Sequence, residues 1–453
     1  MSQVIPEGWF VTSLDTIASW GSGGTPSRKN AAYYGGNVPW IKTGDLGDRV
    51  VSNASEFITD EAVKNSSAKW FPKGSVVLAM YGATIGKTSI LGLDATTNQA
   101  CGVGHPINGA TFTEFLYYFL RNEKDAFIAK GKGGAQPNIS QALIKDHEIA
   151  LPPLAEQKVI ADKLDELLAQ VESTKARLDA IPAILKSFRQ SVLAAAVSGK
   201  LTEEWRGNSE LIGWQHGLLA DFVMKPTYGS SAKSDNEGLV PVLRMGNLQD
   251  GKLDWSNLVY TSDKEEISKY RLNAGDVLFN RTNSPELVGK TSIFRGEREA
   301  IYAGYLIKIT CLDCLNPEYL NFHLNSLGAK EYCRTVKSDG VSQSNINAKK
   351  LAAYPMMLPP VEEQTEIVRR VEELLAFADK VEAQVNAAQA RVNNLTQSIL
   401  AKAFRGELTA DWRAANPELI SGENSTEALL KRIKAERAKL KPVKKTTAKK
   451  AKA

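Results

Sequence analysis

The stretch LPPLAEQKVIADKLDELLAQVE, which begins at Leu151, decides the architecture because the chain contains it twice. The second copy, LPPVEEQTEIVRRVEELLAFAD, begins at Leu358, and the two copies close on QSVLAAAVSGKLTEEWR and QSILAKAFRGELTADWR. Residues 151–206 and 358–413 align without a gap at an offset of about 207 positions, with about 23 identical residues in 56. A repeat of this length is interpreted before any local pattern, since it determines how the chain divides.

Apolar residues recur in each copy at alternating steps of three and four positions, which is typical of helices that pack along one another. Each Leu-Pro-Pro suits a helix start, whereas Pro182 lies inside the first helix and should kink it. Two paired helices are therefore expected, and the alternative is two independent amphipathic helices, each packed on its own domain. The expected seam consists of Leu164, Leu167, Val171, Leu178, Leu185 and Phe188 in the first helix and Val371, Leu374, Val385, Val392, Leu395 and Ile399 in the second.

The segments that precede the helices also match each other, although more loosely. VPWIKTGDL at Val38 matches VPVLRMGNL at Val240, and GGAQPNIS at Gly133 matches DGVSQSNIN at Asp339. KGSVVLAMYGATIGKTSIL likewise matches AGDVLFNRTNSPELVGKTSIF. Short apolar runs broken by Gly, Pro and Asn indicate strands and turns. Framework strands that recur while loops diverge suggest two related targets on one scaffold.

The expected fold class is therefore α+β, with two repeated α/β domains separated by two long helices. After the second helix, Asn424 with Glu427 could form a capping box for a last short helix, and the lysine-rich end should be disordered. The expected domains are residues 1–150 and 207–357, the helical segments are 151–206 and 358–413, and the C-terminal helix and basic tail are 414–453.

Length, charge and cysteine content narrow the class of protein to which the chain can belong. A chain of 453 residues has room for two to four domains. The net charge of +5 arises in residues 431–453, which hold 11 basic residues and one acidic residue, so a DNA-binding surface requires charge segregated on one face. Four irregularly spaced cysteines and the N-terminal sequence MSQVIPEGWF predict a cytoplasmic protein. No unbroken apolar run approaches the roughly 20 residues that span a bilayer, so no membrane association is expected.

Two patterns suggest bound phosphate or metal but fail on their spacing. GATIGKTS at Gly82 has three residues, not four, between its glycine and the Gly-Lys pair, so it is not a phosphate-binding loop. We interpret it as a strand turn with Lys87 and its counterpart Lys290 facing outward. Cys311 and Cys314 form a single C-x-x-C without a second pair of ligands, so a structural zinc site is not expected.

Catalytic motifs are not evident in the sequence. Glu156-Gln157-Lys158 resembles part of a nuclease site, but Thr365 replaces the lysine in the second copy. Neither a nucleophile elbow nor a glycine-rich cofactor fingerprint is present. We therefore expect a non-enzymatic chain that binds no metal or cofactor itself.

Polar and planar side chains are abundant in the loops of both segments. Arg, Asn, Gln and Lys read base edges in DNA, while Lys, Ser and backbone amides position phosphates. A solvated loop is the alternative for each single residue. The candidate DNA-binding residues are Arg28, Lys29, Asn30, Tyr33, Tyr34, Tyr81, Thr84, Lys87, Lys132, Gln136 and Asn138 in the first segment and Arg244, Asn280, Arg281, Thr282, Asn283, Lys290, Lys337, Gln343 and Asn345 in the second.

Together, the repeated blocks resemble the specificity subunit of type I restriction–modification systems. The resemblance rests on IPEGW at Ile5, both helical copies with their SGKLTEEWR and RGELTADWR ends, and ALLKRIKAER near the C-terminus. It implies a non-catalytic subunit whose two domains each read half of a bipartite, asymmetric DNA target. The helices would pack antiparallel, with pseudo-twofold symmetry.

The resemblance also implies protein partners for the chain. These would be two adenine-N6 methyltransferase subunits, which use S-adenosylmethionine, and in the full complex two restriction subunits, which translocate DNA with ATP and Mg. One alternative is the specificity subunit of a methylation-only complex. The other is a helical protein-interaction scaffold without DNA readout.

Overall fold

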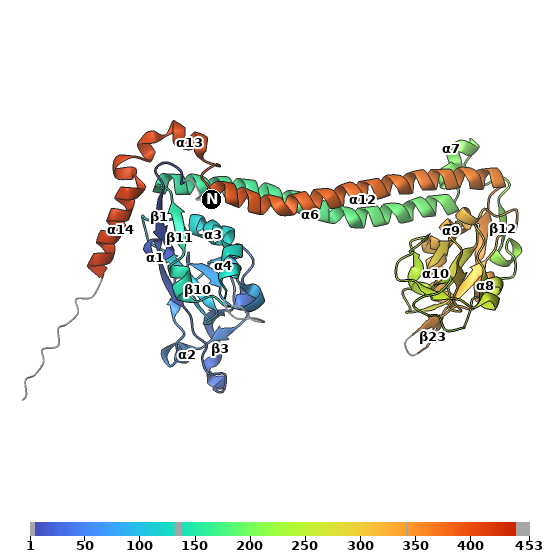
Figure 1. Cartoon of the computed structure of the whole chain (residues 1–453), viewed down its shortest axis with the longest axis horizontal. Coiled ribbons are helices and arrows are strands. Elements are labelled where there is room, and N and C mark those ends of the chain that lie inside the picture. Colours follow the sequence, from blue (N-terminus) through green and yellow to red (C-terminus); the bar gives the residue numbers. More distant parts are fainter. Residues whose placement is uncertain (1–4, 132–137, 341–342, 441–453) are drawn as a thin grey trace, which may run out of the picture. The chain divides into compact units, whose positions relative to one another are not determined.

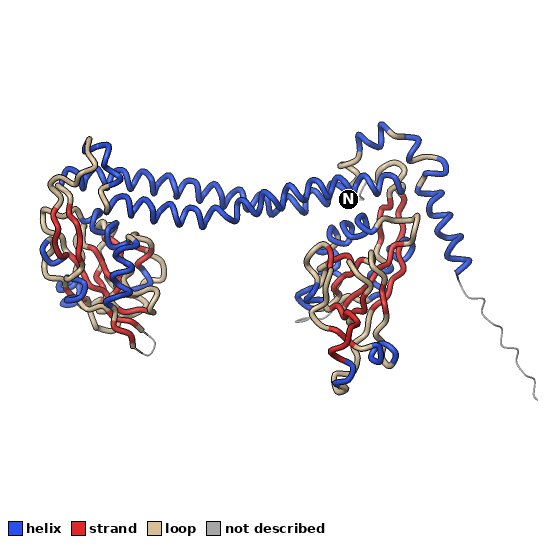
Figure 2. The backbone as a smooth tube through the Cα atoms, turned by 180° about the vertical axis from the view of Figure 1, so that it is seen from behind, coloured by secondary structure: helices blue, strands red, loops and turns tan. Residues whose placement is uncertain are grey.

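The computed structural model describes residues 5–131, 138–340 and 343–440. It divides into two compact units, of which unit 1 comprises residues 1–177 and 389–453 and unit 2 comprises residues 178–388. Each unit contains one α/β domain together with parts of both long helices (Figures 1 and 2). The helices are therefore shared between the units and do not form a separate body, so the expected domain boundaries remain a prediction.

The two long helices are α6, Leu154–Val197, and α12, Val361–Phe404, each of 44 residues. Each begins directly after a Pro-Pro pair, as expected, because proline cannot donate a backbone hydrogen bond but fits the start of a helix. Pro182 lies within α6 without ending it.

The two helices pack against each other within each unit. In unit 1 the early part of α6 shares a core with the late part of α12, and in unit 2 the late part of α6 shares a core with the early part of α12. This arrangement is antiparallel and excludes independent helices. The core residues are Leu164, Leu168, Leu400, Ala403 and Phe404 in unit 1 and Val192, Leu193, Ala196, Ile367 and Val371 in unit 2.

The buried stripe follows the expected seam only in part. Six of the twelve seam residues are at most 8% exposed, namely Leu164, Val171, Leu185, Val371, Val385 and Val392. Leu167, Leu178, Phe188, Leu374 and Ile399 are half-buried, and Leu395 is 45% exposed, so its assignment to the seam was wrong. Leu168 and Leu400 are buried instead, because they belong to the same core cluster as residues of the unit 1 domain.

Among the described residues, α6 is the one helix long and apolar enough to cross a membrane by length and composition alone. Its best 18-residue window has a mean hydropathy of 1.2, a property that inspection for unbroken apolar runs did not detect. Within unit 2, however, Arg189 of α6 pairs with Asp379 and Glu382 of α12 at 2.9 and 2.7 Å. A single helix of this kind is weak evidence for a membrane span.

The domain of unit 1 is built on a five-stranded sheet with the order β2-β10-β7-β8-β4 and a four-stranded sheet with the order β5-β3-β9-β6, while β1 pairs with β11. Its strands are β1 Phe10–Ser13, β2 Ala18–Ser22, β3 Tyr34–Ile41, β4 Val50–Val51, β5 Phe57–Ile58, β6 Trp70–Phe71, β7 Val76–Ala79, β8 Thr88–Leu91, β9 Ala95–Thr97, β10 Cys101–Pro106 and β11 Glu148–Leu151. Its helices are α1 Leu14–Ile17, α2 Asp60–Lys64, α3 Thr113–Asn122, α4 Lys124–Lys130 and α5 Gln141–Lys145.

The domain of unit 2 follows the same plan with smaller sheets, of which β13-β22-β18-β20, β17-β14-β21 and β19-β24-β23 are the largest. Its strands are β12 Gln215–Leu218, β13 Thr227–Tyr228, β14 Val240–Leu243, β15 Leu248–Gln249, β16 Lys252–Leu253, β17 Val259–Thr261, β18 Val277–Asn280, β19 Thr282–Asn283, β20 Thr291–Ile293, β21 Ile301–Tyr302, β22 Leu306–Ile309, β23 Ser338–Asp339, β24 Ser344–Asn345 and β25 Pro355–Leu358. Its short helices are α7 Glu203–Arg206, α8 Lys264–Tyr270, α9 Pro317–Asn325, α10 Leu327–Val336 and α11 Ala348–Ala352.

The chain continues after α12 with α13, Ala410–Ala415, and α14, Thr426–Leu440. The last short helix is thus confirmed, but its capping residue is Ser425, whose hydroxyl accepts a hydrogen bond from the Ala428 backbone at 3.2 Å. Asn424 instead donates to the Glu418 carbonyl, because it lies one residue too early for the helix start. The lysine-rich end from residue 441 lies outside the described residues.

A buried carboxylate ties the start of α6 to both ends of unit 1. Glu156 is fully buried and accepts hydrogen bonds from the Trp9 indole at 2.9 Å, the Thr409 hydroxyl at 2.6 Å and the Arg413 guanidinium at 2.8 Å. These partners come from the N-terminal segment and from the segment after α12. The nuclease-like Glu-Gln-Lys pattern is therefore a structural element, and Glu156 is its centre.

The same cluster recurs in unit 2 around Glu363, which is 2% exposed. Its carboxylate accepts from the Trp214 indole at 2.9 Å and the Thr202 hydroxyl at 2.6 Å, and it pairs with Arg206. We call the two sets the carboxylate clusters of unit 1 and unit 2. A buried charge needs such partners because an unpaired one is strongly unfavourable.

Candidate nucleic-acid interface

The candidate loops of the two domains have the same pattern of backbone hydrogen bonds. The Ala79 amide donates to the Lys87 carbonyl at 2.8 Å, and the Asn280 amide donates to the Lys290 carbonyl at the same distance. Both GKTS segments thus close a turn into the next strand, which confirms the strand-turn interpretation. Lys87 is exposed, whereas Lys290 is half-buried and donates to the Gln249 side chain at 3.0 Å.

The next residues in each domain are also equivalent. The Ile139 amide donates to the Met80 carbonyl at 2.9 Å, and the Ile346 amide donates to the Arg281 carbonyl at 2.9 Å. One step further, Tyr81 bridges Asn138 and Thr282 pairs with Asn345. The match between the two loops, expected from sequence, therefore holds in the backbone, although Met80 is buried where Arg281 borders a cavity.

The Arg281 side chain has two contacts in unit 2. Its guanidinium lies 4.7 Å from the centre of the Tyr228 ring, and one of its nitrogens lies 3.5 Å from the Asn345 side-chain oxygen. The Asn345 amide in turn donates to the Thr282 hydroxyl at 2.8 Å, which fixes its orientation. Arg281 Nε is buried without a hydrogen-bond partner among the described residues. This donor is therefore held in place but unsatisfied within the unit.

Two neighbouring cavities share a wall made by Arg244 and Tyr305. One, of about 510 Å³, is also lined by Arg281, and the other, of about 450 Å³, by Asn257. Tyr305 is 53% exposed, and the Arg244 guanidinium donates to the Asn257 carbonyl at 2.9 Å. Within the described part of the chain neither arginine forms an ion pair, so both retain an uncompensated positive charge.

The corresponding region of unit 1 is neutralised. Glu56 pairs with both Arg28 and Lys42, the latter at 3.0 Å. These hydrogen bonds, that from Arg28 foremost, lower the pKa of Glu56 to about 2, so the carboxylate stays charged. Arg28 also stacks 4.3 Å from the centre of the Tyr34 ring. Two of the cations on this surface are therefore occupied within the domain.

Several other candidates stabilise their own loops. Asn30 caps the turn at Ala31–Tyr33, Tyr34 donates to the Pro26 carbonyl at 2.6 Å, and the Thr84 hydroxyl donates to the Tyr81 carbonyl at 2.9 Å. Asn280 is fully buried, so its side chain does not lie on the surface. Tyr33 is half-buried and packs against the same small core cluster as Tyr34. Asn283 accepts from the Ser284 amide, and Lys337 pairs with Asp339.

The remaining candidates are exposed or outside the described residues. Lys29, Tyr81, Asn138 and Gln343 are exposed. Lys132 and Gln136 lie outside the described residues. Sequence reasoning missed Lys42, Glu56, Tyr228 and Tyr305. Of these, Lys42 could have been found, because the repeat places it opposite Arg244 after VPWI and VPVL.

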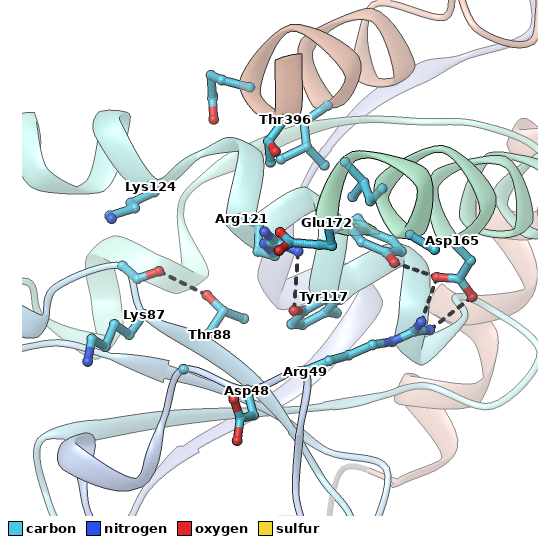
Figure 3. A pocket seen from close by; sticks show the side chains of 17 residues that line it. Asp48, Arg49, Lys87, Thr88, Tyr117, Arg121, Lys124, Asp165, Glu172 and Thr396 are labelled. Atoms are coloured by element: carbon cyan, nitrogen blue, oxygen red, sulfur yellow. Dashed lines mark hydrogen bonds and ion pairs between the residues drawn. The ribbon is translucent and has the colours of Figure 1, made fainter. Parts of the chain in front are cut away.

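A further cavity of about 610 Å³ lies in unit 1 where the domain meets the helices (Figure 3). Arg49 pairs with Asp165 of α6 at 2.8 Å, and the Arg121 guanidinium lies 3.4 Å from the Tyr117 hydroxyl. Lys87 and Lys124 lie on the side away from Asp165. Burial raises the pKa of the Tyr118 hydroxyl, which donates to Asp165 and therefore stays protonated at neutral pH. These two lysines form no ion pair within the described part of the chain, and they suit contacts with phosphate better than with bases.

Metal-ligating residues do not gather in the described part of the chain, where no three His, Cys, Asp or Glu side chains are placed to hold an ion. Cys311 and Cys314 are free thiols, and burial raises the pKa of Cys311 to about 12. A thiol with so high a pKa is a poor metal ligand, because the thiolate is the binding form.

Comparison with known proteins identifies the family. The family model described as type I restriction modification DNA specificity domain matches residues 6–183 and 212–388. The EcoKI specificity subunit of Escherichia coli K12 is 38% identical over 452 residues, covering 96% of both chains. The StySPI specificity subunit of Salmonella potsdam is 38% identical over 466 residues, covering 99% of both.

Solved structures share the fold. A chain from a study of complex assembly in a type I restriction–modification system matches 89% of this chain and 99% of its own, with a TM-score of 0.65 and 19% identity. The HsdS subunit from Thermoanaerobacter tengcongensis matches 89% and 98%, with a TM-score of 0.61 and 20% identity. The chain therefore belongs to the family of type I restriction–modification specificity subunits, which serve these systems in DNA recognition and not in catalysis.

Proposed function

We propose that this specificity subunit reads a bipartite, asymmetric DNA target, with one half recognised by the domain of each unit. One observation carries the proposal: the two domains present different side chains on the same backbone frame. Met80 and Arg281 occupy one matched position, and Tyr81 and Thr282 the next. Two domains with the same backbone arrangement and different side chains suit two DNA half-sites of different sequence. Base edges are distinguished by the donors and acceptors that face them.

The partners that we propose are an adenine-N6 methyltransferase subunit in two copies and, in a full complex, two ATP- and Mg-dependent restriction subunits. S-adenosylmethionine and ATP would be bound by those partners and not by this chain. The repeated carboxylate clusters support a doubled partner, since they give the two units the same local construction. A cytoplasmic location is part of this proposal.

Phosphate contacts would supply affinity without sequence preference. Lys87 and Lys124 in unit 1 are exposed and have no ion-pair partner among the described residues. In unit 2, burial lowers the pKa of Lys330, and the charges of Lys186, Arg334 and Lys290 lower it further against the opposing effect of Asp250. A cluster of like charges is relieved by an anion, and DNA phosphates provide one.

Methylome sequencing tests the proposal directly. Cells that express the chain with its methyltransferase partner should show methylated adenines in one bipartite motif, whereas the chain alone should give no methylation in a single-turnover assay with labelled S-adenosylmethionine. Exchange of residues 207–357 for those of a relative should change one half of the motif and leave the other. Methylation by the complex without sequence preference would favour a helical scaffold, and methyl transfer by the isolated chain would contradict a non-catalytic role.

A further inference from the structure

Arg281 combines three properties of a base-reading residue. Its stacking on Tyr228 and its contact with Asn345 restrict the side chain before any ligand arrives. The side chain is half-buried and lines a cavity of about 510 Å³. A planar guanidinium held in this way matches the two acceptors, O6 and N7, that guanine presents in the major groove.

Charge distinguishes this cavity from the same region of unit 1. In unit 1, Pro39 pairs with Phe57, and the amide of the next residue, Trp40, donates to the Glu56 carbonyl. In unit 2, Val242 pairs with Val259. Trp40 and Val242 are the third residues of the equivalent VPWI and VPVL segments, so Val259 holds the position of Glu56. Val259 lines the Arg281 cavity, so an apolar side chain stands where unit 1 has its neutralising carboxylate.

Arg244 differs from Arg281 in its surroundings. It is exposed, it lines both cavities, and its guanidinium donates to a backbone carbonyl. Its counterpart Lys42 is paired with Glu56. An exposed cation beside a stacked one suits a phosphate contact, which positions the duplex without reading its sequence.

We propose that Arg281 selects a guanine in the half-site read by unit 2, and that Arg244 binds an adjacent backbone phosphate. Unit 1 lacks this device, because Met80 replaces Arg281 and Glu56 holds Lys42. The inference rests on the proposed function and deepens it by assigning the base and the residue. It predicts that guanine selection through this matched position belongs to one half-site only.

The first experiment uses the full chain in complex with its methyltransferase partner. Initial methylation rates are measured on duplexes that carry every single base change in both half-sites. Arg281→Lys and Arg281→Ala should lower the preference for one guanine by about 5- to 150-fold, the range of a good bidentate contact, and leave every other position unchanged. Arg298→Ala is the matched control, because Arg298 stacks 4.6 Å from the Trp255 ring in the same domain but lines neither cavity.

The second experiment separates phosphate binding from base reading. Arg244→Ala should weaken binding to all sequences alike and reduce the log–log salt slope by about 0.9. Val259→Glu, which introduces the carboxylate of unit 1, should weaken binding strongly, whereas Val259→Gln has nearly the same shape without the charge and should not. Equal effects of the two Val259 substitutions would contradict the electrostatic argument.

The outcomes distinguish this inference from the proposed function. A wild-type complex that methylates no bipartite motif overturns the proposed function. A wild-type complex with a bipartite motif, but with no guanine in either half or with guanine preference unchanged in Arg281→Lys and Arg281→Ala, overturns the inference alone. Thermal unfolding of each variant with its partner shows whether a change reflects DNA recognition or loss of folding.

Discussion

The carboxylate clusters and the matched loop positions show opposite behaviour in the two units. Around Glu156 and Glu363 the same residue types recur, with one Trp, one Thr and one Arg bound to each carboxylate. At the loop position of Met80 and Arg281 the backbone hydrogen bonds recur but the side chains do not. The residues that attach a domain to the helices are thus preserved within the chain, while those at the candidate DNA surface have diverged.

The difference has a physical reason. A buried carboxylate must keep all its donors, because loss of one leaves a charge or an N–H without a partner. A surface position on a fixed backbone tolerates almost any side chain, since solvent satisfies what the protein does not. Selection for a new DNA target could therefore act on the loops without disturbing the clusters. The following predictions test this contrast.

The largest effect is expected when a carboxylate cluster is broken. Glu363→Ala leaves the buried Arg206 and the Trp214 indole without their acceptor, and should lower the free energy of unfolding by about 3–5 kcal/mol. Hydrogen exchange followed by mass spectrometry should show lost protection in unit 2 and not in unit 1, and Glu156→Ala should give the reverse. Glu372→Ala, an exposed position on the same helix, is the control. Equal protection in Glu363→Ala and wild type would show that the cluster does not anchor the domain.

Acid should destabilise unit 2 through His323. Each domain contains a pair of packed rings, one of which directly precedes the last strand of the domain. The pair is Phe119 with His147 in unit 1 and His323 with Tyr354 in unit 2. Burial lowers the pKa of His323 to about 4, so as the pH falls from about 6.5 to 4 the unfolded chain gains a proton that the folded domain does not. Stability present above pH 6.5 is lost across that window, on the order of 3 kcal/mol in total.

Phe119, which unit 1 has at the position of His323, suggests the substitution that tests this titration. His323→Phe removes the titrating group and places the ring type of Phe119 in the same position, so the loss of unit 2 stability between pH 6.5 and 4 should become smaller. Urea unfolding at several pH values measures it, with the exposed His216→Gln as control. An unchanged pH dependence in His323→Phe would assign the acid sensitivity to other groups.

The smallest effect concerns the helices themselves. Pro182 in α6 and Gln389 in α12 occupy matched positions of the repeat. Proline inside a helix removes one hydrogen bond and crowds the preceding turn, so Pro182→Gln should raise the free energy of unfolding by about 1–3 kcal/mol. Gln389→Pro should lower it by a similar amount. Urea unfolding monitored by circular dichroism compares the two, and a loss of stability in Pro182→Gln would show that the surrounding structure requires the proline.

The sequence alone determined the two long helices, the paired domains and the match between their loops. These predictions follow from the internal repeat and from helical periodicity. Both can be read from the sequence without knowing which distant residues are in contact. The equivalence of Asn138 and Asn345, for example, follows from one constant offset and holds in the hydrogen bonding. The heptad frame was less reliable, because Leu400 and not Leu395 is buried.

Only the tertiary structure decided which loop residues are available to a ligand. Glu56 neutralises Arg28 and Lys42 across intervals of 28 and 14 residues, and Tyr228 lies against Arg281, 53 positions further along the chain. Strand register turned the Asn280 side chain into the core. Such pairings depend on which strands become neighbours and on which face each side chain occupies. No local pattern encodes them, so a list of polar loop residues could not separate Arg281 from Arg28.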